Sequence, residues 1–274
     1  MDLPKLRRIR IAVVLSLATA TMVSAQRFGG RYGACQSNWD ADNYFVSPFF
    51  AGNPRYDGRV TFARIKYRGA YECGREGPGW AHDYPRTESH FVRILRDISA
   101  VRPFVEDGPI TGGAVVRLDE PALSYYPIAY LSEPGGWNMS EAEVTGLRNY
   151  IQRGGFIIFD DIEGAPNPDY ENLVVQWRRA FPAATPIRLT NEHRIFNTFF
   201  SIDLSKIPSK TGLYAPEYMG IFEDNDPAKR LVAIIDNYAD VGELIQWSDE
   251  GFDVVPSNEA YKLWVNYFVY ALTH

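Results

Sequence analysis

The hydrophobic positions of this chain follow two patterns that alternate along the sequence. Short runs rich in apolar and β-branched residues, which are typical of strands, are separated by stretches in which apolar residues recur every three or four positions, as in amphipathic helices. The runs that predict strands span residues 60–67, 114–118, 127–131, 156–159, 187–190, 214–222 and 231–235. The stretches that predict helices span residues 87–98, 140–153, 169–180 and 257–274. Strands that alternate with helices favour an α/β fold with a largely parallel, doubly wound sheet.

The most sharply defined predicted element is the helix 140–153. Ser140 can cap its first turn while Glu143 reaches back to the backbone of Ser140, which together form a capping box. Gly154 fits the left-handed position that ends many helices. The fully apolar run 156–159 follows at once. It predicts a central strand, because the strands of a parallel sheet are buried on both faces.

The first 25 residues have the features of a secretory signal peptide. Residues 11–18 form a short apolar segment, and Val23-Ser24-Ala25 is a small-residue cleavage site. The basic residues that precede the apolar segment are Lys5, Arg7, Arg8 and Arg10. We therefore expect export, to the periplasm or out of the cell.

The mature chain is expected to contain one domain. Residues 26–59 are rich in Gly, Asn and aromatic residues without periodicity. They predict an irregular arm that packs its rings on the main domain. No linker follows residue 60, so residues 60–274 are expected to fold as a single α/β domain.

The charge of the chain argues against two classes of partner. The full sequence has a formal net charge of −6, and removal of the signal peptide takes away four basic residues and one acidic residue, which leaves −9. Binding to nucleic acid or to an anionic membrane surface requires basic residues. No apolar run of about 18 residues follows the signal peptide, so no membrane span is expected in the mature chain.

Cys35 and Cys73 are the two cysteines of the chain. In an exported protein an even pair predicts a disulfide, which would tie the N-terminal arm to the loop after the first strand. The alternative is a pair of buried thiols. In the chain-entropy model such a bond would contribute about 3–4 kcal/mol to stability.

Several stretches together resemble the domain-of-unknown-function family numbered 4159. They are residues 62–67, 80–85, 126–128, 147–156, 160–161 and 259–266, and the resemblance covers about residues 58–273. That family is similar to class I glutamine amidotransferases, so the resemblance implies a flavodoxin-like, three-layer sandwich. It implies no established activity. Glutaminases of this fold need a cysteine on a sharp strand-to-helix turn, and neither Cys35 nor Cys73 lies at such a turn.

Asp160 and Asp161 are the first candidate site residues. They follow the predicted central strand, and ligands of open α/β sheets bind at the carboxyl ends of strands. One of them, together with Glu163, could serve as a metal ligand or a general base. Because side chains alternate along a strand, only one is expected to point into a cleft. The structural alternative is that one carboxylate caps the next turn and the other is solvated.

The segment His82-Asp83-Tyr84-Pro85 follows the first strand and also lies at a predicted carboxyl end. Asp83 could join Asp160 across the sheet as a catalytic carboxylate, with Tyr84 as a ligand-binding neighbour. His82 could titrate near neutral pH. The alternative is a rigid turn in which Asp83 bonds backbone amides.

Glu192 and His193 follow a later strand and could supply a ligand contact and a base. Ser132 ends the strand 127–131 and could contact a ligand or act as a nucleophile beside His193. The chain has no G-x-S-x-G turn of the kind that exposes a nucleophilic serine. A lone histidine in a loop is more often a surface residue, so each of these roles competes with a structural one.

Two functions are consistent with this pattern. The first is an exported α/β domain that binds a protein partner or a small ligand at the carboxyl edge of its sheet. The alternative is a hydrolase, metal-assisted or not, that uses Asp83, Asp160, Asp161 and His193. The sequence specifies neither a cofactor nor an oligomeric state.

Overall fold

The computed structural model of the chain describes residues 52–69, 78–105, 113–163 and 168–274. The predicted signal peptide, most of the N-terminal arm and both cysteines, Cys35 and Cys73, lie outside the described residues. The disulfide, the cleavage site and the export that they predict therefore stay predictions.

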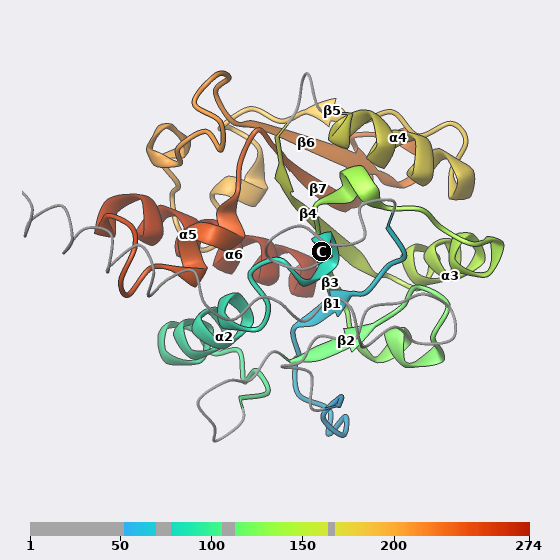
Figure 1. Cartoon of the computed structure of the whole chain (residues 1–274), viewed down its shortest axis with the longest axis horizontal. Coiled ribbons are helices and arrows are strands. Elements are labelled where there is room, and N and C mark those ends of the chain that lie inside the picture. The colour runs from blue at the N-terminus through green and yellow to red at the C-terminus, as the bar shows by residue number, and fades with distance from the viewer. Residues whose placement is uncertain (1–51, 70–77, 106–112, 164–167) are drawn as a thin grey trace, which may run out of the picture.

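A seven-stranded sheet runs through the described chain in the order β2-β1-β3-β4-β7-β6-β5 (Figure 1). The strands are β1 (Ala63–Ile65), β2 (Ala114–Val116), β3 (Ile128–Ser132), β4 (Phe156–Ile162), β5 (Ile187–Arg188), β6 (Glu217–Phe222) and β7 (Leu231–Asn237). Neighbours from β2 to β7 pair in parallel, whereas β6 pairs antiparallel with both β7 and β5. The predicted α/β fold with a mostly parallel sheet is confirmed.

Helices cover both faces of this sheet and give it three layers (Figure 1). One face carries α2 (Arg86–Ile98), α5 (Val241–Gln246) and α6 (Val254–Thr273), and the other carries α3 (Glu141–Gln152) and α4 (Asp169–Ala180). Each face has its own hydrophobic core, with Phe91 and Trp264 in the first and Leu147 and Trp177 in the second. No helix in the described part of the chain is long and apolar enough to cross a membrane.

The local signals around α3 act as predicted. The Glu143 backbone N–H donates to Ser140 Oγ at 3.3 Å, and the Ser140 N–H donates to the Glu143 carboxylate at 2.7 Å, which completes the capping box. Gly154 has a φ of 100°, and β4 begins two residues later. These contacts fix the point at which the central strand enters the sheet.

Two elements near the C-terminus differ from the prediction. The short helix α5, of six residues, was not predicted, because so few residues show no helical periodicity. The last helix begins at Val254 rather than Ser257. Its first turn exposes Val254 and Val255, so the buried stripe that predicts the helix starts one turn late.

The carboxyl end of β4 is irregular. Its register with β7 shifts between Phe159 and Ile162, as in a β-bulge. Asp161 has a φ of 62° at this point. The bulge breaks the alternation of side chains, so that Asp160 faces α5 while Asp161 turns toward the edge of the sheet.

Candidate functional site

The backbone at the carboxyl edge of the sheet is left-handed at four residues other than glycine. Asp83, Glu133, Asp161 and Tyr238 have φ between 47° and 62°, and they belong to the ends of, or the loops after, β1, β3, β4 and β7. This conformation costs a residue with a Cβ roughly 1–2 kcal/mol. Such strain is retained mainly at functional sites, so four cases at one edge mark it as a candidate.

Four side chains with metal-ligating atoms converge at this edge. One atom from each of His82, Asp83, Asp161 and Asp240 lies within 4.8 Å of the others. His82 Nδ1 is 2.6 Å from Asp161 Oδ2. Lys210 Nζ pairs with Asp161 Oδ1 and lies 3.7 Å from Asp240 Oδ2. Imidazole nitrogen and carboxylate oxygen are the atoms that bind divalent ions such as Zn²⁺ and Mn²⁺.

Two carboxylate oxygens of this group are buried without a hydrogen-bond partner. They are Oδ2 of Asp83 and Oδ2 of Asp240, in side chains that are almost fully buried. Burial, and then the charge of Asp240, raise the pKa of Asp83 well above its usual range. An unsatisfied buried acceptor costs about 1–3 kcal/mol, and more when it is charged. The fold therefore maintains an acidic pair that its own hydrogen bonds do not satisfy.

Asp160 lies behind this group and is held by the start of α5. Its carboxylate accepts hydrogen bonds from the backbone N–H groups of Val241 at 3.0 Å and Gly242 at 2.7 Å. Burial, followed by the charge of Asp240, raises the pKa of Asp160 to about 7. A Cβ on Gly242 would lie 2.7 Å from Tyr130 Oη and 3.0 Å from Asp83 Oδ2, so this approach requires glycine.

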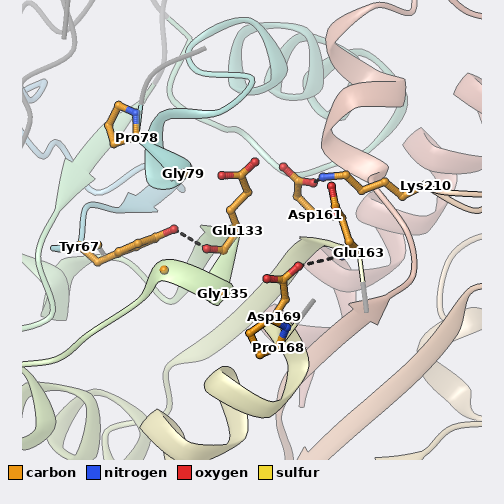
Figure 2. A pocket seen from close by; sticks show the side chains of 12 residues that line it. Tyr67, Pro78, Gly79, Glu133, Gly135, Asp161, Glu163, Pro168, Asp169 and Lys210 are labelled. Carbon is orange, nitrogen blue, oxygen red and sulfur yellow. Dashed lines mark hydrogen bonds and ion pairs between the residues drawn. The ribbon is translucent and has the colours of Figure 1, made fainter. Parts of the chain in front are cut away.

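A cavity of about 290 Å³ opens beside the group (Figure 2). Asp161 and Lys210 line it on one side, and Glu133, Glu163 and Asp169 supply further carboxylates. Lys210 is the one cationic side chain among the described residues that line it. Burial raises the pKa of Asp169 to about 6. Among the described residues, the lining of the cavity is therefore strongly acidic, with one positive charge.

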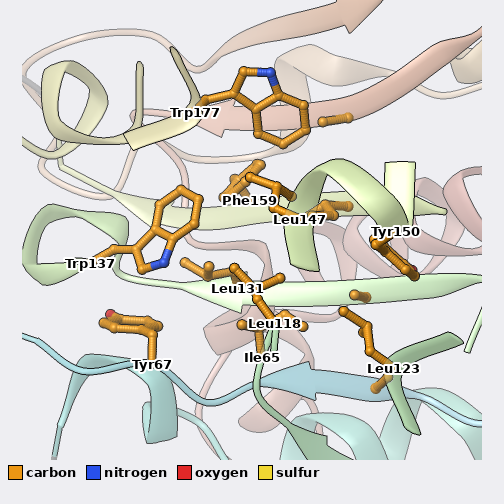
Figure 3. Packing of buried hydrophobic residues seen from close by; sticks show 14 of the residues in the cluster. Ile65, Tyr67, Leu118, Leu123, Leu131, Trp137, Leu147, Tyr150, Phe159 and Trp177 are labelled. Atoms are coloured by element: carbon orange, nitrogen blue, oxygen red, sulfur yellow. The ribbon is translucent and has the colours of Figure 1, made fainter. Parts of the chain in front are cut away.

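One wall of this cavity is anchored to the hydrophobic core. Tyr67 lines it and also belongs to the hydrophobic core that contains Trp137 and Leu131 (Figure 3). The Tyr67 hydroxyl donates to the backbone carbonyl groups of Ser132 at 2.9 Å and Glu133 at 2.5 Å. This contact connects the end of β1 to the end of β3 and fixes the position from which the Glu133 side chain leaves the backbone.

The structure brings together some of the residues that the sequence predicts. Asp83 and Asp161 lie in the four-residue group, and Asp161 alone of the Asp160–Asp161 pair lines the cavity, because the bulge turns the two side chains in different directions. Ser132 Oγ is 3.4 Å from Asp161 Oδ2. Tyr84 lies apart from the cavity lining, with its ring 5.7 Å from the guanidinium of Arg64.

His193 lies elsewhere, and the expectation that it would join these aspartates is wrong. Its ring packs against those of Phe222 and Tyr270, and Tyr270 packs against Phe156 at the start of β4. Four strand residues, roughly 13 Å, separate Phe156 from Asp160. The Ile195 N–H donates to His193 Nδ1 at 3.3 Å.

The position of His193 also removes the suggested pairing with Ser132, whose hydroxyl instead contacts Asp161. Glu192 is exposed in the turn that carries His193, away from the cavity. The histidine that does lie with the aspartates is His82, which the turn after β1 supplies. The proposed four-residue constellation therefore forms only in part.

Four charged residues of the site have no counterpart among the predicted site residues, one of them Asp169 at the start of α4. Asp240 follows β7, and the strand-end rule that identified Asp160 would have identified it as well. Glu133 follows β3, next to Ser132, and could have been found in the same way. Lys210 lies in the irregular segment between β5 and β6, and no local pattern signals its position.

Comparison with known proteins identifies the family alone. A family model described as Domain of unknown function (DUF4159) matches residues 61–272, which is most of the chain. No curated protein matches it. The family predicted from the sequence is therefore confirmed.

Proposed function

The chain belongs to the DUF4159 family, and we propose that this member binds a small, positively charged ligand in the cavity at the carboxyl edge of its sheet. The observation that carries the proposal is the imbalance of charge in the cavity. Of the lining residues that the structure describes, four carry carboxylates (Glu133, Asp161, Glu163 and Asp169), and Lys210 carries the one ammonium group.

The size of the cavity favours a small molecule over a protein partner. Its volume of about 290 Å³ lies near the lower end of the range for small-molecule sites, which runs from about 300 to 1,000 Å³. Protein interfaces instead bury roughly 800 Å² on each partner. A compact ligand that places an ammonium or guanidinium group beside Glu133 and Asp169 would offset the excess negative charge.

A thermal-shift series on the mature chain in the presence of EDTA tests this proposal. We expect arginine, lysine and spermidine to raise Tm at millimolar concentration, and neutral sugars and citrate to leave it unchanged. Glu133→Gln and Asp169→Asn should each remove the shift. Asp97→Asn removes the same charge from an exposed site on α2 and should keep it. The proposal is overturned if no cation stabilises the protein or if the shift persists in both cavity variants.

Hydrolysis is a second candidate, and the contact between His82 and Asp161 favours it. A carboxylate 2.6 Å from Nδ1 orients an imidazole and strengthens it as a general base. The side chain of His82 is 17% exposed, so its ring is accessible to water.

Assays with chromogenic esters and amides that carry a cationic group would separate hydrolysis from binding alone. His82→Gln should lower the rate at least 100-fold, whereas His193→Gln should leave it unchanged. Equal losses in the two variants, or no turnover by the unmodified protein, would exclude this second function.

We also propose that the protein is exported from the cytoplasm. It is supported by the basic, apolar and small-residue segments of residues 1–25. Mass spectrometry of the secreted protein should give a chain that begins at Gln26, and a Cys35–Cys73 disulfide that resists alkylation until it is reduced. Recovery of the uncleaved chain in the cytoplasm, with both thiols alkylatable, would contradict it.

A further inference from the structure

We infer that His82, Asp83, Asp161 and Asp240 form a binding site for one divalent transition-metal ion beside the cavity. The inference goes beyond the proposed function, because uptake of an ion requires no ligand in the cavity. It stands on the geometry of four side chains and on the two buried oxygens that have no hydrogen-bond partner.

The spacing of the four ligand atoms suits a single ion. Bonds from Zn²⁺ to nitrogen and oxygen are about 2.0–2.2 Å long, so two ligands of one ion lie about 3.5 Å apart in a tetrahedral site and at most about 4.4 Å apart when they are opposite. The four atoms here lie within 4.8 Å of one another. Side-chain movements of about an ångström would therefore bring them onto one ion.

The unpartnered oxygens distinguish this group from an ordinary acidic patch. The Asp83 side chain is buried, and neither its Oδ2 nor that of Asp240 accepts a hydrogen bond. Buried carboxylates are normally hydrogen-bonded or bound to metal. A bound cation would give both oxygens a partner, which no described side chain does by hydrogen bonding.

Lys210 is an alternative source of positive charge at this site, but it balances only part of the negative charge of the carboxylates. Its ammonium group contacts Asp161 and Asp240. It does not donate a hydrogen bond to Asp83 Oδ2. One positive charge faces three carboxylates, and the nearby Arg64 forms a buried ion pair with Glu88. A divalent ion would supply the charge that remains uncompensated.

The donor set favours a transition ion over Ca²⁺ or Mg²⁺. Those two ions prefer sites made entirely of oxygen, whereas Zn²⁺ and Mn²⁺ accept one imidazole nitrogen among carboxylates. Because Asp161 also lines the cavity, the ion would lie against the ligand site. A metal in that position could activate water, which is the chemistry that the second candidate function needs.

Calorimetric titration of the EDTA-treated, dialysed mature protein with Zn²⁺, Mn²⁺ and Ca²⁺, together with elemental analysis, tests the inference. We expect one Zn²⁺ or Mn²⁺ ion per chain and Ca²⁺ binding at least 10-fold weaker. Asp83→Asn, Asp240→Asn and His82→Gln should each weaken uptake at least 100-fold while the circular-dichroism melt stays cooperative. Lys210→Met should bind the ion at least as tightly as the unmodified protein.

His193→Gln is the matched control, because it removes an imidazole from the other edge of the sheet and should bind the ion normally. The inference is overturned by the absence of uptake, by uptake that survives both aspartate variants, or by equal loss in His193→Gln. If only the metal-site inference is wrong, organic cations still raise Tm in the presence of EDTA. If only the cation-binding proposal is wrong, the protein still takes up the metal ion. The two proposals can therefore fail separately.

Discussion

The two edges of the same sheet differ in the residues that adopt a left-handed backbone at the strand ends. At the amino edge, left-handed conformations fall on Gly113, on Gly154 and on the exposed turn Asp224-Asn225. At the carboxyl edge they fall on Asp83, Glu133, Asp161 and Tyr238, and the two aspartates are buried. Glycine adopts this conformation without steric cost, whereas side chains with a Cβ do not.

The polar groups of the two edges differ in the same way. At the amino edge, Arg230 donates to the backbone carbonyl groups of Ile151 and Gly155, and His193 accepts a backbone N–H. At the carboxyl edge, Asp83 and Asp240 each keep an unsatisfied oxygen. The polar groups of the amino edge are satisfied within the fold, whereas the carboxyl edge keeps backbone strain and buried carboxylate oxygens without hydrogen bonds.

Two glycine substitutions should produce the largest difference between the edges. Gly242→Ala places a Cβ 2.7 Å from Tyr130 Oη and 3.3 Å from Asp160 Oδ2, and should lower the free energy of unfolding by about 3 kcal/mol. Gly154→Ala meets no atom within 4 Å and should cost only about 1 kcal/mol, through its positive φ. Urea denaturation of both variants measures the two losses. Equal losses would remove the claim that the carboxyl edge is the more tightly constrained.

A pair of polar deletions should separate the edges by a smaller amount. Asp160→Ala removes the acceptor of two buried backbone N–H groups and should cost about 2 kcal/mol. His193→Ala removes the acceptor of one N–H group and some ring packing, and should cost about 1 kcal/mol. Thermal unfolding followed by circular dichroism measures both. A larger loss for His193→Ala would reverse the comparison.

Strain at a single residue can be tested with two substitutions at Glu133. Because its φ is 47°, Glu133→Gly should be more stable than Glu133→Ala by about 1 kcal/mol. At Glu141, in the first turn of α3, the order should be the reverse. Chemical denaturation of the four variants gives the two differences. The same order at both positions would show that the carboxyl edge is relaxed.

Acid should affect the two edges in opposite directions. Burial raises the pKa of Asp169 to about 6, so its contribution to stability is largest at low pH and is lost as the pH rises through 6. Burial lowers the pKa of His193 in the folded state, so its contribution is lost as the pH falls below the unfolded value of about 6.5.

Between pH 7 and pH 5 the unmodified protein should therefore gain stability relative to Asp169→Asn and lose stability relative to His193→Gln. Each change should be about 1 kcal/mol or less, because both side chains are partly exposed. Urea denaturation at the two pH values measures it. Changes of the same sign in the two comparisons would contradict the opposite pKa shifts of Asp169 and His193.

The fold was predictable because its signals are local. The capping box of Ser140 and Glu143, the glycine at 154 and the apolar run after it act within a few residues of one another, and each is confirmed. The short helix α5 has no such signal of its own. Its cap, Asp240, accepts the N–H of Glu243, but six residues are too few to show a period.

The site was predictable only where a strand end was enough to locate it. The strand-end rule correctly brought Asp83 and Asp161 to one edge. It failed for His193, because β5 has only two residues and the chain after it folds back beneath the sheet toward α6. Lys210 reaches the site from an irregular segment, and that kind of approach depends on tertiary packing that no local pattern encodes.

The strand order determines when this site can first exist as the protein is synthesised. Asp161 ends β4, but its neighbour β7, which leads to Asp240, lies far along the chain, after Lys210, β5 and β6. A nascent chain that has passed β4 therefore holds three of the four ligand groups without the fourth, and without the α5 amides that fix Asp160. The four-residue group is therefore complete only when β7 and α5, in the C-terminal third of the chain, have folded against β4.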